Sequence, residues 1–262
     1  MSLLTVENIG ISFGGLRAVD GVGFTVSAGE VFSIIGPNGA GKTTLFNLIT
    51  GIYQPSQGKV SLSGQPLTGL PPHLLARRGM SRTFQNLQIF FRMTALENVM
   101  VGCHLSERTH LLSDLLGLPR VGRQNRETCE RARSLLERVG LADTADRLAG
   151  SLSYGALKRL EIARALAADP KILLLDEPAA GCNSVETEAI DRLICAIAAN
   201  GVAVILIEHD MKLVMKISNR ILVLAQGRHL AEGTPREVRE NPAVIAAYLG
   251  EHGAREADRA QG

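Results

Sequence analysis

The sequence has no tryptophan and few aromatic residues of any kind, since Phe, Tyr and Trp together make up 4% of its 262 residues. It also has little net charge, because 28 Lys and Arg stand against 26 Asp and Glu, and this balance gives no reason to expect a nucleic-acid partner. With 45% hydrophobic and 21% charged residues, the composition is that of a folded globular chain rather than a disordered one.

Cysteines and long apolar runs are scarce as well. Cys103, Cys129, Cys182 and Cys195 form neither a CxxC metal pattern nor a dense disulfide framework, so we expect a reducing compartment. The first residues lack the basic and apolar regions of a signal peptide. The longest apolar runs, such as Val202–Ile207, are far shorter than the ~20 residues that cross a bilayer. Any role at a membrane is therefore expected to be peripheral.

Glycine is abundant, with 27 residues, and it lies among elements that alternate in type. Apolar runs bounded by turns predict strands at 3–11, 23–26, 30–35, 58–62, 171–175 and 202–207, a short strand within 83–91, and a hairpin formed by 221–224 and 229–231. Helical patterns occur at 42–50, 74–82, 157–168, 186–199 and 235–249, and residues 94–148 are mostly helical. Strands that alternate with helices predict an α/β fold with a mostly parallel sheet.

Residues 36–43 fit the pattern G-x-x-x-x-G-K-[ST] between a predicted buried strand and a predicted helix. Glycines let the backbone curl so that successive N–H groups converge on phosphate oxygens. Lys42 adds positive charge at the β- and γ-phosphates, and the Thr43 hydroxyl can bind Mg²⁺. The alternative is a glycine-rich turn without a ligand, which the flanking elements disfavour. The predicted ATP site comprises Gly36, Pro37, Asn38, Gly39, Ala40, Gly41, Lys42, Thr43 and Thr44.

Two carboxylates, Asp176 and Glu177, follow the predicted strand 171–175. Ligands of parallel sheets gather at the carboxyl ends of the strands. Asp176 is therefore predicted to hold Mg²⁺, and Glu177 to polarise the water that attacks the γ-phosphate. The alternative is an acidic pair that caps the next helix.

A small-residue turn at 151–155 leads into a predicted helix and forms a second place that can bind an anion. Its sequence, Leu-Ser-Tyr-Gly, resembles the Leu-Ser-Gly-Gly-Gln signature motif of ABC transporter ATP-binding subunits. The resemblance spans nearly the whole chain. It implies that Ser153 and Gly155 contact the γ-phosphate of ATP on an opposite subunit. Ala156 stands where the family has Gln or Glu, which puts that contact in question.

The family resemblance assigns roles to three further residues. Gln85 matches the glutamine of the Q-loop, a γ-phosphate sensor and Mg²⁺ ligand, and His209 matches the switch histidine. Phe13 falls at the aromatic position that stacks on adenine, although packing at a strand end explains it equally well. Residues 177–183 resemble the D-loop, with Cys182 and Asn183 in place of the usual Leu and Asp.

The resemblance also implies the domain organisation of a P-loop NTPase of the ABC ATPase type. Residues 1–93 would form the N-terminal part of the ATPase core with an antiparallel β subdomain and the phosphate loop. Residues 94–168 would form a helical subdomain with the signature motif, 169–250 the C-terminal part of the core, and 251–262 a disordered tail.

Two segments suggest contacts with a membrane or a membrane protein. Residues 86–93, Asn-Leu-Gln-Ile-Phe-Phe-Arg-Met, are too apolar for an ordinary solvated loop and are predicted to dock a helix of a permease, unless they pack within this chain. The basic stretch 120–138 could meet anionic headgroups, although interleaved glutamates make a solvated helix face the stronger interpretation.

The spacing between Gln85 and Leu152 and the segment 233–251 resemble ATPases of branched-chain amino acid importers. The resemblance implies Mg²⁺ and ATP as cofactors, a homodimer or a heterodimer with a paralogous ATPase, permease subunits, indirectly a solute-binding protein, and a place at the cytoplasmic face of the cell membrane. Amide or urea importers and lipopolysaccharide exporters share much of the C-terminal pattern. A soluble ABC ATPase and a subunit that binds nucleotide without hydrolysing it are further alternatives.

Overall fold

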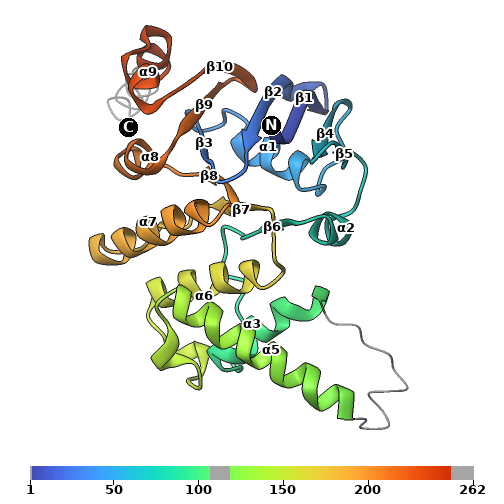
Figure 1. Cartoon of the computed structure of the whole chain (residues 1–262). Helices are drawn as coiled ribbons and strands as arrows, with labels where there is room; N and C mark the ends of the chain where they lie inside the picture. The colour runs from blue at the N-terminus through green and yellow to red at the C-terminus, as the bar shows by residue number, and fades with distance from the viewer. Residues whose placement is uncertain (1, 107–118, 249–262) are drawn as a thin grey trace. The chain divides into compact units, whose positions relative to one another are not determined.

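The computed structural model describes residues 2–106 and 119–248, and the chain divides into two compact units (Figure 1). The first unit combines the residues up to Arg78 with those from Ile194 onward, and the second unit runs from Gly79 to Leu193. Each unit carries part of the predicted nucleotide chemistry.

An antiparallel sheet with strand order β2-β1-β4-β5 forms one layer of the first unit. Its strands are β1 (Ser2–Phe13), β2 (Leu16–Ser27), β4 (Gln57–Leu62) and β5 (Gln65–Pro66). The strands predicted at 3–11 and 23–26 are confirmed and extend further. They form a hairpin because Gly14 and Gly15 adopt positive φ angles of 53° and 87° in its turn.

The second sheet of this unit has the strand order β10-β9-β3-β8. These strands are β3 (Val31–Ile35), β8 (Ala203–Ile207), β9 (Arg220–Ala225) and β10 (Arg228–Gly233). β3 lies parallel to both β8 and β9, and every residue of β3 and β8 is buried. This burial on both faces explains their continuous apolar sequences.

The described residues of the first unit include four short helices. They are α1 (Lys42–Ile49), α2 (Pro72–Arg77), α8 (Met211–Ile217) and α9 (Pro235–Glu240). Part of the core joins the sheet to α8 and α9, and it contains Ile35, Val214, Ile221, Val223 and Val238.

The second unit contains the parallel pair β6 (Met80–Arg82) and β7 (Ile172–Asp176) and a group of helices. The helices are α3 (Ala95–Gly102), α5 (Pro119–Arg138) and α6 (Tyr154–Leu166), with short 3₁₀ turns η1 (Cys103–Ser106), η2 (Ala142–Thr144) and η3 (Ala149–Ser151). α3, α5 and α6 pack against one another (Figure 1). α7 (Ser184–Ala199) begins in this unit. Within the described part of 94–148, the predicted helical character is confirmed.

The predicted helix at 74–82 is wrong in its second half, and the strand predicted within 83–91 is absent. α2 ends at Arg77, Gly79 takes a φ of 94°, and residues 80–82 form β6 instead. Met80 pairs with Ile172 and Arg82 with Leu174. Pairing with a distant strand therefore overrides the local helical pattern.

The helix predicted at 235–249 is interrupted. α9 ends at Glu240, and Asn241 has an extended backbone with φ −75° and ψ 117° before helical structure resumes at 242–248. Asn241 precedes Pro242, whose ring disfavours helical geometry at the preceding residue. Leu249 and the predicted tail at 251–262 lie outside the described residues, and the domain boundaries remain predictions. In the described ranges, every helix is too short or too polar to traverse a bilayer.

Candidate nucleotide site

The phosphate loop of the first unit connects β3 to α1, as the sequence predicts. Gly36, Gly39 and Gly41 have φ angles of 152°, 76° and 96°, which are left-handed geometries that favour glycine. A Cβ on Gly36 would lie 2.2 Å from the Leu224 carbonyl oxygen, and one on Gly41 would lie 2.5 Å from that of Ala18. A Cβ on Gly39 would meet open space. The loop is thus packed against its neighbours on one side and open on the other.

Lys42 and the start of α1 give this loop a positive character. The Lys42 ammonium donates hydrogen bonds to the carbonyl oxygens of Gly36 (2.6 Å) and Pro37 (2.9 Å), so it lies within the curve of the loop. Gly41 is the N-cap residue of α1 and supplies no side-chain acceptor for the first N–H groups of the helix. An anion fits this end of the helix, because these N–H groups carry partial positive charge. Thr43 is exposed and Thr44 is half-buried beside it.

Glu208 and His209 follow β8, which lies next to β3 in the sheet. Ile34 pairs with Ile207 in a parallel register, so the residues after β8 emerge at the same sheet edge as the phosphate loop. Glu208 is buried, whereas His209 is exposed, and the His209 N–H donates to the Glu208 carboxylate at 3.1 Å. The structure therefore brings the predicted switch histidine to the edge that carries the phosphate loop.

Phe13 ends β1 and has 46% of its surface exposed. Its ring contacts that of Tyr53 edge-on, with the ring centroids 5.3 Å apart. Tyr53 is held by a hydrogen bond from its N–H to the Asn47 carbonyl of α1 at 3.1 Å. Phe13 thus packs against a neighbour and also keeps surface in solvent, and its role in adenine stacking stays a prediction.

In the second unit, Asp176 ends β7 and is buried in an ion pair with Arg82 at the end of β6. Arg82 Nη2 lies 3.2 Å from Asp176 Oδ2, and the Asp176 N–H donates to the Thr83 hydroxyl at 3.3 Å. Burial raises the pKa of the Asp176 carboxyl above its usual value, while the Arg82 guanidinium opposes this rise. The predicted metal ligand is therefore held in place by a cation of its own chain.

Glu177, the predicted catalytic residue, has a left-handed backbone with φ 50°. Such a conformation is rare for a residue with a side chain and is often found at functional positions. Gln85 Nε2 donates to Glu177 Oε2 at 3.4 Å. The buried Lys158 of α6 donates to the backbone oxygens of Glu177 (3.4 Å) and Gln85 (3.5 Å). The structure thus brings Gln85 next to Glu177, which follows Asp176 in the chain.

The signature turn begins α6, with Ser153 as its N-cap residue. The Ala156 N–H donates to the Ser153 hydroxyl at 3.3 Å. Glu186 Oε1 accepts hydrogen bonds from the Ser153 hydroxyl and from the Gly155 N–H, both at 3.2 Å. Asn183, the residue that replaces the usual Asp, accepts from the N–H groups of Val185 and Glu186 at 3.0 Å. The amide of Asn183 therefore caps α7 through its oxygen, as an aspartate would.

The described residues contain no group of three or more His, Cys, Asp or Glu side chains that could hold a metal ion by themselves. Mg²⁺ is commonly held by one or two protein oxygens together with substrate phosphates and water. Thr43 in the first unit, and Gln85 and Asp176 in the second, carry oxygen atoms of the kind that Mg²⁺ prefers, so each is suited to an ion that arrives with a nucleotide.

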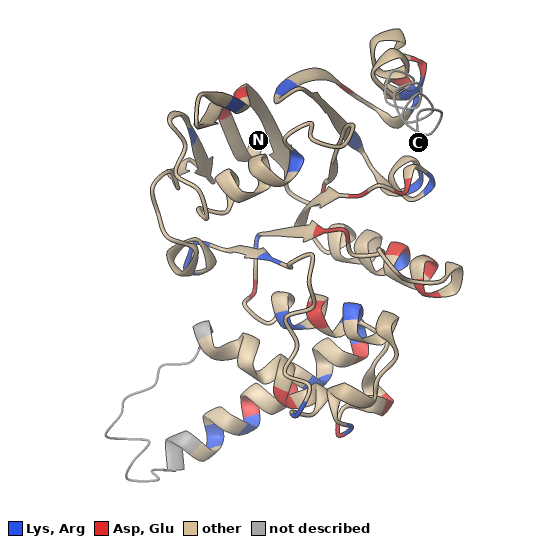
Figure 2. Ribbon diagram, turned by 180° about the vertical axis from the view of Figure 1, so that it is seen from behind, with Lys and Arg blue, Asp and Glu red and all other residues tan. Residues whose placement is uncertain are grey.

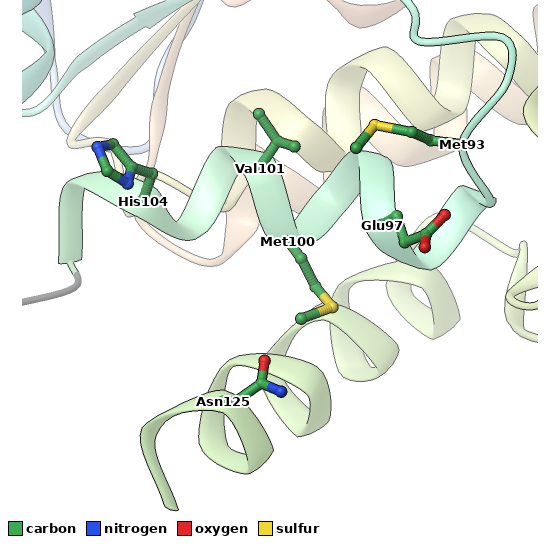
Figure 3. A pocket seen from close by; sticks show the side chains of 6 residues that line it. All are labelled: Met93, Glu97, Met100, Val101, His104 and Asn125. Carbon is green, nitrogen blue, oxygen red and sulfur yellow. The ribbon is translucent and has the colours of Figure 1, made fainter. Parts of the chain in front are cut away.

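A pocket of about 400 Å³ lies beside α3 and α5 in the second unit (Figure 3). Met93, Glu97, Met100, Val101, His104 and Asn125 line it. Close by in sequence, Phe90 and Phe91 are 49% and 50% exposed. The prediction of an apolar surface at 86–93 is thereby supported for these two rings, whereas Ile89 is buried. Figure 2 shows basic and acidic residues interspersed along α5, and Arg123 and Glu127 form an exposed ion pair there, which favours a solvated face.

Three residues of the second unit were not singled out from the sequence: Arg82, Lys158 and Glu186. Arg82 precedes Gln85 closely, but its partner Asp176 is distant in the chain. Lys158 and Glu186 likewise act on residues in other segments. A charged residue at a buried helix position, as in α6, is the one local signal that points to Lys158.

Known proteins share the sequence and the fold. The profile of the family "ABC transporter" matches residues 19–180, and that of "Branched-chain amino acid ATP-binding cassette transporter" matches residues 228–254. The chain is 51% identical over 250 residues to the "High-affinity branched-chain amino acid transport ATP-binding protein BraF" of Pseudomonas aeruginosa, an alignment that covers 95% of this chain and 98% of the relative.

Two solved structures extend this similarity. An ATP-binding cassette of an ABC transporter in its ADP conformation is 35% identical, with a TM-score of 0.83, and the match covers 95% of this chain and 99% of the other. A dimeric ATP-binding cassette in a post-hydrolysis state, bound to ADP and Pi, is 27% identical, with a TM-score of 0.73 and coverage of 89% and 99%. The chain therefore belongs to the ABC transporter family, and its fold is that of the family's ATPase subunit, the ATP-binding cassette.

Proposed function

We propose that this protein hydrolyses Mg·ATP as the energy-coupling subunit of an importer for branched-chain amino acids. The observation that carries the proposal is the contact of Glu177 with Gln85 beside Asp176, on a chain that also presents an open phosphate loop. These are the residue types that phosphoryl transfer to water requires.

In the proposed reaction, the phosphate loop and Lys42 would bind the β- and γ-phosphates, and Thr43, Asp176 and Gln85 would hold Mg²⁺. The ion would neutralise charge on the phosphate oxygens. Glu177 accepts a proton from the attacking water, and Gln85 orients the Glu177 carboxylate through their hydrogen bond. His209, which is exposed after β8, would contact the γ-phosphate.

The proposed assembly contains two such subunits, identical or paralogous. Ser153 and Gly155 of one subunit would meet the γ-phosphate of ATP held by the other, because they lie at the N-terminus of α6, where a helix favours an anion. The similar ATP-binding cassette that is a dimer bound to ADP and Pi supports an assembly of two such subunits. The permease would dock on Phe90, Phe91 and the pocket beside α3, and the subunit would then lie at the cytoplasmic face of the membrane.

The choice of branched-chain amino acids rests on the similarity to BraF along 95% of the chain and on the C-terminal segment that matches the corresponding family profile. A permease and a solute-binding protein would select the solute. This chain would supply the energy for transport.

The proposal is tested by purifying the tagged chain with its membrane partners and measuring leucine uptake in proteoliposomes. Leucine uptake and phosphate release should both depend on Mg·ATP. Glu177→Gln should abolish phosphate release while ATP still binds, because the amide keeps the shape but cannot accept the proton. Glu188→Gln removes a charge from the exposed side of α7 and is the control that should retain activity. Turnover by Glu177→Gln at the parent rate would remove Glu177 from the mechanism, and uptake of another solute class alone would overturn the assignment to branched-chain amino acids.

A further inference from the structure

The donors of the signature turn are bound by a carboxylate of the same chain. Glu186 Oε1 lies 3.2 Å from both the Ser153 hydroxyl and the Gly155 nitrogen. The approach is so close that a Cβ on Gly155 would lie 2.4 Å from Glu186 Cδ. A glycine at position 155 therefore leaves room for an anionic group directly against the start of α6.

The other oxygen of the same carboxylate belongs to the cap of α7. Glu186 Oε2 accepts the Asn183 N–H at 3.2 Å, while the Asn183 amide oxygen accepts the N–H groups of Val185 and Glu186. This reciprocal arrangement is a capping box. Glu186 thus joins the start of α7 to the start of α6, and the two helix N-termini share one negative charge.

A second contact joins the same two segments. A Cβ on Gly181 of the D-loop would lie 3.1 Å from the Tyr154 ring. Tyr154 is the residue that replaces the usual glycine of the signature motif. The Tyr154 side chain of the signature turn therefore lies against the D-loop backbone at Gly181, within one protomer.

We propose that Glu186 is a positioning residue. In the free protomer its carboxylate accepts the hydrogen bonds of the Ser153 hydroxyl and the Gly155 N–H. In the dimer, these two donors would bind the γ-phosphate of the ATP held by the partner subunit. ATP-driven dimerisation must then displace the carboxylate from Ser153 and Gly155. This inference rests on the proposed function, because it needs Ser153 and Gly155 to meet a nucleotide across a dimer.

The physical argument is competition between two anions for one set of donors. A carboxylate and a phosphate oxygen both accept from backbone N–H and hydroxyl groups at a helix N-terminus, and they repel each other if both are present. The partner's phosphate therefore binds only after Glu186 has moved. Movement of Glu186 also frees the Asn183 N–H, so the D-loop changes its contacts when the dimer forms.

Glu186→Gln separates this role from a purely structural one. Gln still accepts the Asn183 N–H, since Gln serves in capping boxes as Glu does, so α7 keeps its cap. The neutral amide binds the donors of α6 more weakly than the carboxylate, because charge-assisted hydrogen bonds are roughly twice as strong as neutral ones. A loss of competition should therefore favour the ATP-bound dimer.

The experiment measures Mg·ATP-dependent dimerisation of the full chain by sedimentation velocity in the Glu177→Gln background. Adding Glu186→Gln should lower the ATP concentration at half-dimerisation by about tenfold. Glu188→Gln is the matched control, because Glu188 lies on the same helix, is exposed and pairs with Arg192 at 3.2 Å. This control should leave the midpoint unchanged within about twofold.

Glu186→Asp provides a second, independent variant. It keeps the charge but shortens the side chain, so the carboxylate withdraws from Ser153 and Gly155, and the midpoint should again fall. In protein with Glu177 intact, Glu186→Gln should lower the KM for ATP and leave kcat nearly unchanged, whereas loss of a merely structural link would lower kcat.

The outcomes separate the two proposals. If Glu177→Gln dimerises with ATP but both Glu186 variants leave the midpoint unchanged or raise it, Glu186 is only a link between helices and the inference is wrong. If Glu177→Gln itself stays monomeric in Mg·ATP, the pairing of two identical subunits fails, and the inference, which is tested on that pair, fails with it.

Discussion

Arg82 and Asp176 form an ion pair with 11% and 5% of their side chains exposed, and their closest atoms are 3.2 Å apart. The Arg82 guanidinium also lies 5.1 Å from the centre of the Phe84 ring, next to Gln85. One cation therefore contacts the predicted metal ligand and the start of the Q-loop. Removal of a single partner from a buried pair leaves an uncompensated charge, which is costly.

Arg82→Met is predicted to lower the free energy of unfolding by about 3 kcal/mol, because Asp176 would be buried without its counterion. Urea denaturation at neutral pH measures this loss. Arg133→Met is the control, since Arg133 and Asp146 lie at the same distance of 3.2 Å but are 51% and 78% exposed. Exposed pairs contribute at most ~1 kcal/mol. If both variants lost the same free energy of unfolding, burial would not make the Arg82–Asp176 pair more stabilising than an exposed pair.

The sequence predicts those parts of the site whose geometry is local. The run 30–35, the phosphate loop and α1 follow one another directly, so hydrophobic pattern and glycine spacing are sufficient to predict them. Asp176 and Glu177 are predictable for the same reason, because a buried strand ends directly before Glu177.

Features that depend on distant pairing are not predictable in this way. β6 forms because Met80 pairs with Ile172, and the local sequence of 74–82 contains no sign of that partner. The contacts of Lys158 with Gln85 and of Glu186 with Ser153 also join segments far apart in the chain. The break at Asn241 is different, since the following proline was a local signal for it.

Ala156→Gln is predicted to strengthen ATP-driven dimerisation or raise hydrolysis, because the family places a side-chain amide at this position. A single neutral hydrogen bond contributes ~0.5–1.5 kcal/mol, so the gain should be at most about tenfold. Equilibrium sedimentation with Mg·ATP measures it. Ala156→Leu has similar bulk without a polar group and should give no gain. An identical response to both substitutions would mean that the backbone and the Ser153 hydroxyl suffice.

Glu161→Gln tests the pH dependence of stability. Glu161 lies on α6, is 3% exposed, and burial raises the pKa of its carboxyl, with the Lys158 charge opposing the rise. The folded protein therefore keeps this proton to higher pH than the unfolded chain does. The contribution of the protonated Glu161 carboxyl to stability is complete below its pKa in the unfolded chain, and it is lost as pH rises through its pKa in the folded protein. The variant should accordingly gain stability relative to the parent as pH increases through this range.

The opposite sign is expected for Glu97, which is the control. Donors from Thr94, the N-cap residue of α3, lower the pKa of Glu97. Its contribution is therefore present above the unfolded pKa and lost as pH falls, so Glu97→Gln should be most destabilised near neutral pH. The two variants are compared by measuring their free energies of unfolding between about pH 4 and about pH 8. Parallel curves for both would contradict the assignment.

Phe90→Ser with Phe91→Ser tests the docking surface. Both rings are about half exposed, at 49% and 50%. The backbone of Phe90 is fixed independently of its ring, because its N–H donates to Asn98 Oδ1 at 3.0 Å and its carbonyl accepts from Asn98 Nδ2 at 3.1 Å. The loop should therefore keep its conformation without the two rings, and the isolated variant should still fold and bind ATP.

In the assembled transporter, the same double substitution should abolish solute uptake, because apolar area at the permease contact would be lost. Uptake in proteoliposomes, nucleotide binding and the melting temperature are measured on one preparation. Leu16→Ser is the control, since Leu16 is 73% exposed in the β1–β2 hairpin, and it should leave all three unchanged. A collapse of the melting temperature without any partner would show that the rings stabilise the fold. Normal uptake by the double variant would show that the permease docks on another surface. The exposed rings beside the Q-loop would then have no part in coupling ATP hydrolysis to the permease.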